Sequence, residues 1–154
     1  MTKSRLALVA VTLFSLSGIA LAEDRADGIE VMDSSKDIQA VDQGLREALD
    51  SKGLTLFTVI DHAANAEQAG LALPPTRTFV FGNPKAGTPM MQCQGSMALD
   101  LPQKMLIRQR DAGTRLEWNS PHYLAKRHQL TDCELPLDKV SNLLESLAEE
   151  AARP

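Results

Sequence analysis

The pair Asp61–His62 has the residue types of an acid–base site. A neutral imidazole beside a carboxylate can act as a general base, a metal ligand or a pH sensor. Either side chain can instead cap a helix that begins at Ala63, and this structural interpretation explains the pair equally well. His62 is therefore a candidate catalytic residue, and Asp61 and His62 are both candidate ligand-binding residues.

A second candidate group lies in the stretch Gly82–Gly87, which is dense in turn-forming residues. Its backbone N–H groups and Lys85 could hold an anion, and Asn83 could bind a ligand beside them. The stretch lacks the Gly-x-x-x-x-Gly-Lys-Ser/Thr pattern of a phosphate-binding loop, so a structural turn is the preferred interpretation. Asn83 and Lys85 complete the set of candidate ligand-binding residues.

Sulfur and imidazole groups invite a copper hypothesis, for which the candidate ligands are Met90, Met91, Cys93 and His122. Thioether, thiolate and imidazole ligands suit Cu(I). The chain has no Met-x-x-Met or His-x-x-His spacing, however, and methionine commonly fills gaps in protein cores. We therefore predict no cofactor and keep copper as the alternative.

Residues 1–22 have the pattern of a secretory signal peptide. Lys3 and Arg5 precede an apolar stretch at residues 6–16, and Ala20-Leu21-Ala22 offers a small-x-small cleavage site. The apolar stretch is shorter than the roughly 20 residues of a membrane-spanning helix. We expect cleavage after Ala22 and a periplasmic protein with no stable membrane insertion.

Cys93 and Cys133 are the only cysteines in the chain. Because an oxidising compartment and an even number of cysteines favour a disulfide, we predict that these two form a structural one. A metal site and a reactive thiol are the alternatives. The absence of a Cys-x-x-Cys motif disfavours thioredoxin-like exchange.

Charge and motifs exclude several function classes. The 16 basic and 20 acidic residues give a net charge of −4, which disfavours binding to nucleic acid or anionic lipid. The patterns Gly-x-Ser-x-Gly, His-Glu-x-x-His and the dinucleotide-binding fingerprint do not occur, so a serine hydrolase, a zinc protease or an NAD enzyme is not supported.

The apolar pattern predicts one domain of interleaved helices and strands over residues 35–151, after a flexible segment at residues 23–34 in which residues 29–32 can add a short strand. Interleaving of this kind favours an α+β fold, a two-layer sandwich with a mixed or antiparallel sheet and helices mainly on one face. The predicted helices span residues 38–49, 63–71, 89–93, 121–128 and 137–151. The predicted strands span residues 54–60 and 76–81 and a β-hairpin at 104–110 and 114–119.

The strands at residues 54–60 and 76–81 determine where the candidate residues lie. The connection between them is long enough for a parallel βαβ crossover. The carboxyl ends of two parallel strands share one edge of a sheet, where α/β units place ligands. We therefore expect His62 and Asn83 to lie near one cleft.

Several stretches carry a resemblance to a known family, the domain-of-unknown-function 302 family. They are Gly53-Leu54-Thr55, Ile60-Asp61-His62-Ala63-Ala64-Asn65-Ala66, the run from Phe81 through Gly82-Asn83-Pro84-Lys85 to Gln92, Ala98-Leu99-Asp100-Leu101-Pro102, and Asn119 to Leu124. The resemblance covers residues 35–128 and implies a compact α+β domain that tends to form homodimers, with no accepted activity. The chain departs from the family pattern at Trp118, where we expect Tyr, and at Cys93 and Gln94, where we expect small or acidic residues.

Three functions remain open. The first, which we prefer, is a dimeric periplasmic module that binds or senses a small ligand through Asp61, His62, Asn83 and Lys85. The second is an enzyme or a redox or metal-handling protein that uses His62 and a free Cys93. The third is a structural or interaction domain whose motifs only maintain the fold.

Overall fold

The computed structural model describes residues 28–130 and 133–153, so the predicted signal peptide and residues 23–27 lie outside the described residues. In chain order the elements are β1 (Ile29–Ser34), α1 (Ile38–Ser51), β2 (Thr55–Asp61), α2 (His62–Gln68), β3 (Thr76–Gly82), α3 (Pro84–Cys93), the short 3-10 helix η1 (Gly95–Leu99), β4 (Gln103–Arg110), β5 (Gly113–Asn119), α4 (Pro121–Arg127) and α5 (Leu137–Ala152).

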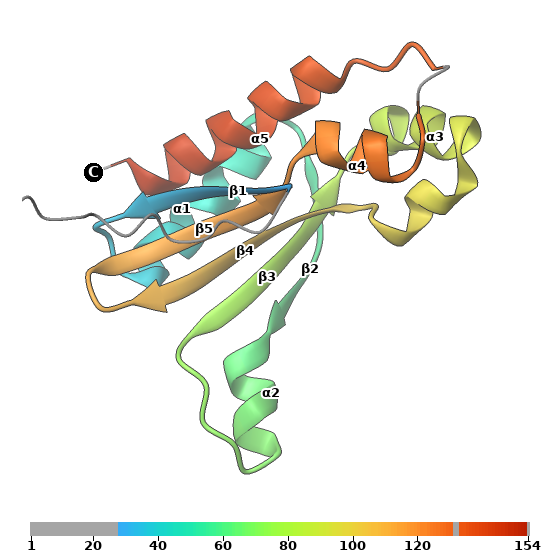
Figure 1. Cartoon of the computed structure of the whole chain (residues 1–154). Helices are drawn as coiled ribbons and strands as arrows, with labels where there is room; N and C mark the ends of the chain where they lie inside the picture. Colours follow the sequence, from blue (N-terminus) through green and yellow to red (C-terminus); the bar gives the residue numbers. More distant parts are fainter. Residues whose placement is uncertain (1–27, 131–132, 154) are drawn as a thin grey trace, which may run out of the picture.

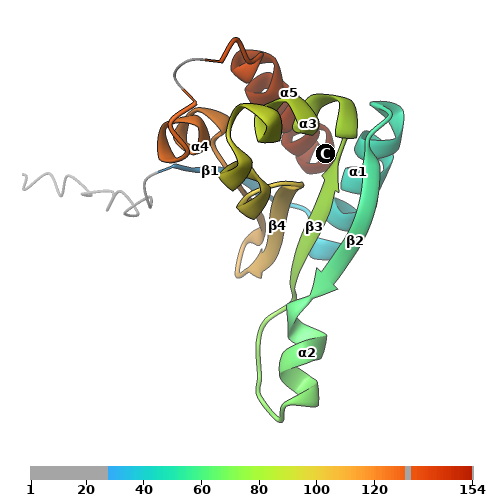
Figure 2. The same ribbon diagram turned by 90° about the vertical axis from the view of Figure 1, so that its right-hand side faces the viewer.

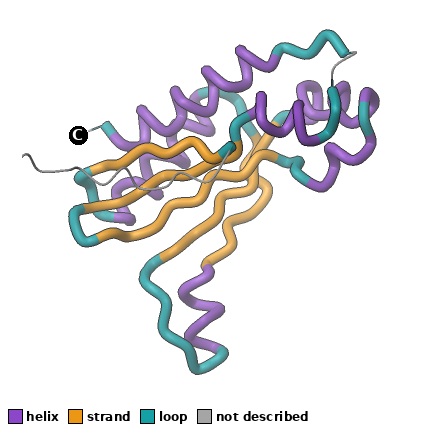
Figure 3. The backbone as a smooth tube through the Cα atoms, viewed as in Figure 1, coloured by secondary structure: helices purple, strands orange, loops and turns teal. Residues whose placement is uncertain are grey.

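The five strands form one sheet in the order β1-β5-β4-β3-β2, and every neighbouring pair is antiparallel. Helices α1 and α5 lie side by side across one face of it (Figures 1 and 3). The predicted α+β fold with helices mainly on one face is confirmed. The hairpin of β4 and β5 and the first and last helices are confirmed as well.

The core lies between that helical layer and the sheet. On α1, Ile38, Val41 and Leu45 recur at helical spacing and are almost completely buried. Alternate residues of the central strands, including Phe79 and Ile107, face them from the sheet. The amphipathic pattern of each element therefore determines which of its faces is buried.

The predicted parallel crossover between β2 and β3 is wrong, because these strands pair antiparallel, with Asp61 opposite Arg77. Helix α2, between them, has no buried residue and projects beyond the sheet (Figures 1 and 2). A crossover helix must bury an apolar stripe against the sheet, and the sequence His62–Gln68 has none. The connection is therefore an extended hairpin tip.

The loop predicted at Gly82–Gly87 needs correction. Gly82 ends β3, Asn83 is the N-cap of α3, and Pro84 begins that helix. The short strand that residues 29–32 could add to the N-terminal segment is present as β1, which pairs with β5 along the edge of the sheet.

A second, smaller core lies beside the main one. Met90, Met97 and Leu124 bring together α3, η1 and α4, and each is at most 3% exposed. The predicted disulfide between Cys93 and Cys133 is present and joins the end of α3 to the segment that precedes α5. No helix in the described part of the chain is long and apolar enough to cross a membrane.

Candidate functional site

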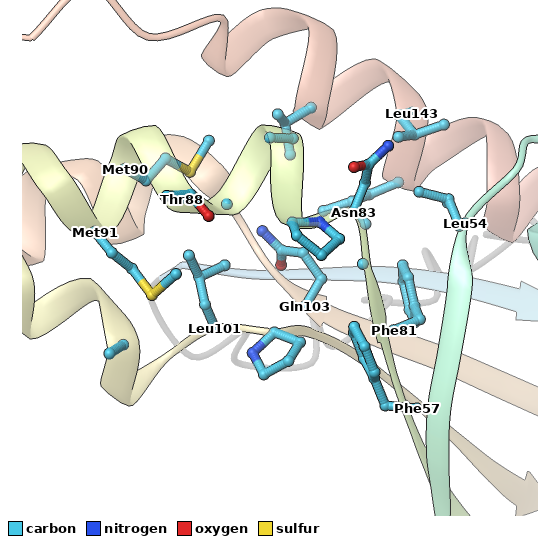
Figure 4. A pocket seen from close by; sticks show the side chains of 18 of the residues that line it. Leu54, Phe57, Phe81, Asn83, Thr88, Met90, Met91, Leu101, Gln103 and Leu143 are labelled. Carbon is cyan, nitrogen blue, oxygen red and sulfur yellow. The ribbon is translucent and has the colours of Figure 1, made fainter.

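A cavity of about 460 Å³ opens where β2, β3 and β4 meet α3 and α5 (Figure 4). Apolar side chains from these five elements, from the residues next to them and from η1 form most of its wall. They are Leu54, Phe57, Phe81, Pro84, Ala86, Met90, Met91, Ala98, Leu101, Pro102, Val140, Leu143 and Leu144.

Local geometry explains why two phenylalanines reach this cavity. Phe81 faces the core side of β3 by the normal alternation of a strand and is 1% exposed. A shift in register between Leu56 and Thr58 displaces Phe57 from the regular ladder of β2, and Phe57 remains 49% exposed. One ring therefore closes the bottom of the cavity while the other lies at its rim.

Few polar side chains reach the cavity, and two of them already have partners. The Asn83 Oδ1 atom accepts a hydrogen bond from the Lys85 backbone N–H at 2.9 Å, which fixes the start of α3. The Lys52 ammonium pairs with Glu150 at 2.7 Å. Thr88 and Gln103 also line the wall, and Figure 4 shows the Gln103 amide directed toward α3. The wall therefore suits a largely apolar molecule with one or two polar groups.

The Asp61–His62 pair lies away from this cavity. Because β2 and β3 are antiparallel, Asp61 and His62 lie at the end of the sheet that carries α2, whereas Asn83 lies at the end that carries α3 (Figure 1). His62 and Asn83 do not share a cleft, and our expectation that they do is wrong. Lys85 is exposed near the start of α3 and is not among the residues that line the cavity.

Asp61 and His62 have separate structural partners on opposite faces of the sheet. Asp61 caps α2 by accepting a hydrogen bond from the Ala64 N–H at 2.9 Å, and it pairs with the Arg77 guanidinium at 3.1 Å. The His62 Nε2 atom lies 2.9 Å from the Thr78 hydroxyl. Since Arg77 and Thr78 are adjacent in β3, their side chains point to opposite faces, and so do those of Asp61 and His62.

Arg77 links the strands to α1. Its guanidinium also contacts the Asp42 carboxylate at 3.0 Å, and Asp42 in turn pairs with Arg46 at 2.5 Å. The Ala64 N–H and the Arg77 guanidinium lower the pKa of the Asp61 carboxyl below its ordinary value. The hydrogen bond that Arg77 donates to the Asp61 carboxylate likewise raises the pKa of Arg77. This network gives Asp61 a structural role, because it joins β2 to α2 and, through Arg77, to α1.

The four candidate copper ligands have different surroundings. Met90 and Met91 line the cavity, and Met90 is 3% exposed within the second core. The sulfur of Cys93 is bonded to Cys133, and His122 lies 3.0 Å from Asp138 on α5. The enzyme hypothesis also required a free Cys93 thiol, which this disulfide removes.

Sequence reasoning missed most of the cavity wall, because its residues come from segments that are far apart in the chain. The motif at residues 82–87 indicated part of the region, but it gave no sign that Phe57, Leu101 or Leu143 lie beside it. One signal in the sequence could have indicated these residues. The stretches that carry the family resemblance include residues 53–55 and 98–102, and both contribute to the cavity wall.

Comparison with a solved structure supports the fold. The crystal structure of an uncharacterized conserved DUF302 protein from Bacillus stearothermophilus superposes with a TM-score of 0.70, covering 83% of this chain and 100% of that one. The two sequences are 16% identical.

Among curated proteins, the chain is similar to two proteins described as fluoride-specific ion channels. It is 38% identical over 104 residues to FluC 1 of Brucella suis and to FluC 2 of Brucella melitensis, which is 67% of this chain. The matched region spans only 41% and 38% of the lengths of those two proteins.

The family model described as "Domain of unknown function DUF302" matches residues 30–151, from β1 almost to the end of α5. This match extends beyond the resemblance over residues 35–128 and includes the helix that closes one side of the cavity. Taken with the solved structure of the same fold, it shows that the chain belongs to the DUF302 family.

Proposed function

We propose that this chain is a binding module for a small, largely apolar molecule, which it holds in the cavity between β2, β3, α3 and α5. The observation that carries the proposal is the cavity itself, about 460 Å³ with a wall dominated by aromatic, aliphatic and methionine side chains. Ligand pockets in proteins are typically about 300–1,000 Å³, mostly apolar, with a few polar groups that orient the ligand.

The wall also defines the chemistry of the ligand. An ion placed among these apolar side chains would lose its hydration with little compensation, which is strongly unfavourable. The Gln103 amide and the Thr88 hydroxyl offer a neutral partner for one carbonyl or hydroxyl group. A neutral aromatic compound or a short acyl compound with one polar group fits these properties.

The proposal includes the periplasmic location and the homodimer. The signal-peptide pattern at residues 1–22 and the disulfide between Cys93 and Cys133 support export, since structural disulfides persist in oxidising compartments. Mass spectrometry of the protein from a periplasmic extract is expected to give the chain cleaved after Ala22, and sedimentation analysis is expected to give twice the monomer mass.

The names of the Brucella proteins raise fluoride as a second candidate ligand. A small, strongly hydrated anion is poorly suited to the apolar cavity. We therefore prefer the neutral ligand. The match spans less than half of each Brucella protein, so the channel function in their names describes those whole proteins.

The test is a fluorescence titration with N-phenylnaphthylamine, a neutral aromatic probe. A side chain at Gly87 would enter the cavity, because a Cβ there lies 3.6 Å from Leu101 Cδ1, an ordinary contact distance. We expect saturable binding by the wild type and about tenfold or more weaker binding by Gly87→Phe.

Two control variants complete the experiment. Gln92→Phe adds the same ring to an exposed position of α3, and His62→Ala removes the imidazole at the opposite end of the sheet. Both are expected to bind the probe like the wild type. Equal binding by Gly87→Phe and the wild type would refute the cavity as the site, and a complete lack of probe binding would favour the structural-domain hypothesis.

A further inference from the structure

A buried histidine between a carboxylate and a serine lies outside the cavity just described. The His128 Nε2 atom is 2.6 Å from Asp100 Oδ2, and its Nδ1 atom is 2.8 Å from Ser96 Oγ. His128 is 6% exposed, whereas Ser96 lies on the surface of η1. Of these three residues only Asp100 belongs to a stretch singled out in the sequence, Ala98-Leu99-Asp100-Leu101-Pro102, and no stretch there connects it with Ser96 or His128.

The order of the contacts determines where the proton lies. The carboxylate of Asp100 only accepts hydrogen bonds, so the Nε2 atom of His128 must carry the proton that it donates. In a neutral imidazole the Nδ1 atom is then an acceptor, and it receives the hydroxyl proton of Ser96. Asp100 therefore holds His128 in the tautomer that can remove the proton from Ser96.

Ser96 is also accessible to a reactant. It lies next to Gly95, where an added Cβ would meet no atom within 4 Å. In a 3-10 helix, residues three apart lie on the same side, which places Leu99 beside Ser96. Leu99 is 76% exposed and offers an apolar surface to an acyl group.

We propose that Ser96 is a nucleophile for acyl transfer from simple esters, with His128 as its general base and Asp100 as the residue that positions His128. A serine is activated when its hydroxyl is hydrogen-bonded to a base and the base is oriented by a carboxylate. Such sets are recognised by their geometry rather than by the positions of the residues in the chain. The proposal is independent of the ligand in the cavity.

The reaction needs only the ester and one molecule of water. The Ser96 Oγ atom forms a bond to the ester carbonyl carbon while its proton moves to His128 Nδ1. The bond to the alcohol oxygen breaks, and the alcohol leaves with that proton. Water, deprotonated by His128, then attacks the acyl group, releases the carboxylic acid and restores the Ser96 hydroxyl.

The experiment treats the full chain with a fluorophosphonate probe and with nitrophenyl acetate. In the wild type we expect labelling of Ser96, located by peptide mapping, and a burst of nitrophenol. Ser96→Ala is expected to lose both, and Ser35→Ala, which alters another exposed serine, is expected to keep both.

Further variants test the base and its positioning residue. His128→Gln keeps a donor toward Asp100 but removes the base, so the labelling rate is expected to fall about a hundredfold or more. Asp100→Asn is expected to slow labelling, and Asp100→Glu to recover part of the rate at an equal folded fraction. Labelling at another residue, no labelling of the wild type, or an unchanged rate in His128→Gln would overturn the proposal.

Discussion

At the scale of single residues, Asp61 shows that a carboxylate next to a histidine, a pair typical of acid–base sites, can also have a structural role. Its carboxylate caps α2 and pairs with Arg77, which reaches on to Asp42 of α1. The sequence placed Asp61 and His62 correctly at a strand end. It could not show that Arg77 lies opposite Asp61, because that pairing depends on strand register.

This role gives Asp61 a defined effect on stability. Its pKa is lower in the folded state than its ordinary value, so its contribution is complete above about pH 4 and is lost as the pH falls through the lowered pKa. Asp61→Ala is expected to reduce the free energy of unfolding by about 1 kcal/mol at pH 7.

Urea denaturation followed by Trp118 fluorescence measures this difference. The difference in the free energy of unfolding between the wild type and Asp61→Ala is expected to become smaller in acid, below the lowered pKa of Asp61. Asp61→Asn keeps an acceptor for the Ala64 N–H, so its free energy of unfolding is expected to fall by less than that of Asp61→Ala. A gap of the same size at neutral and acid pH would disprove the assigned role of the Asp61 charge.

At the scale of elements, the failure of the predicted crossover has a specific physical cause. The length of the connection between β2 and β3 is compatible with either strand direction, so length alone could not decide. Helix α2 consists of alanine and polar residues after His62 and carries no large apolar side chain. Such a helix buries little apolar surface if it packs on a sheet, so packing would stabilise it little. The lack of large apolar side chains could therefore have indicated a hairpin tip.

The disulfide is the element-scale feature that the sequence predicted best, because the even number of cysteines and the expected oxidising compartment both favoured it. It joins residues 40 apart and ties the second core together at Cys93. In the chain-entropy description, a loop of that length contributes about 4 kcal/mol. In the double variant Cys93→Ser and Cys133→Ser, the free energy of unfolding is expected to be lower by up to about 4 kcal/mol.

The test compares urea denaturation of the double variant with that of the oxidised and the reduced wild type. The reduced wild type and the double variant are expected to unfold at similar urea concentrations, both below that of the oxidised wild type. Coincident unfolding curves for all three proteins would contradict a stabilising role.

At the scale of the whole molecule, the fold class could be predicted but the cavity could not. Periodicity identifies helices and strands one at a time, and their interleaving implies an α+β sandwich. The cavity instead depends on how Phe57, Leu101 and Leu143, from three separate segments, meet after folding. Because β2 and β3 pair antiparallel, the residues predicted to share one cleft lie at two ends of the sheet, Asp61 and His62 at the end that carries α2 and Asn83 at the end that carries α3.

The methionines make it possible to test directly whether the cavity holds a small apolar ligand. Met90 and Met91 line it, whereas Met105 is fully buried in the main core and lies outside the wall. The measurement is a titration of protein carrying carbon-13 methionine methyl groups with N-phenylnaphthylamine, followed by NMR. We expect saturable shifts of the Met90 and Met91 signals and an unchanged Met105 signal. Unshifted Met90 and Met91 signals while the probe binds elsewhere would show that the cavity is not the binding site.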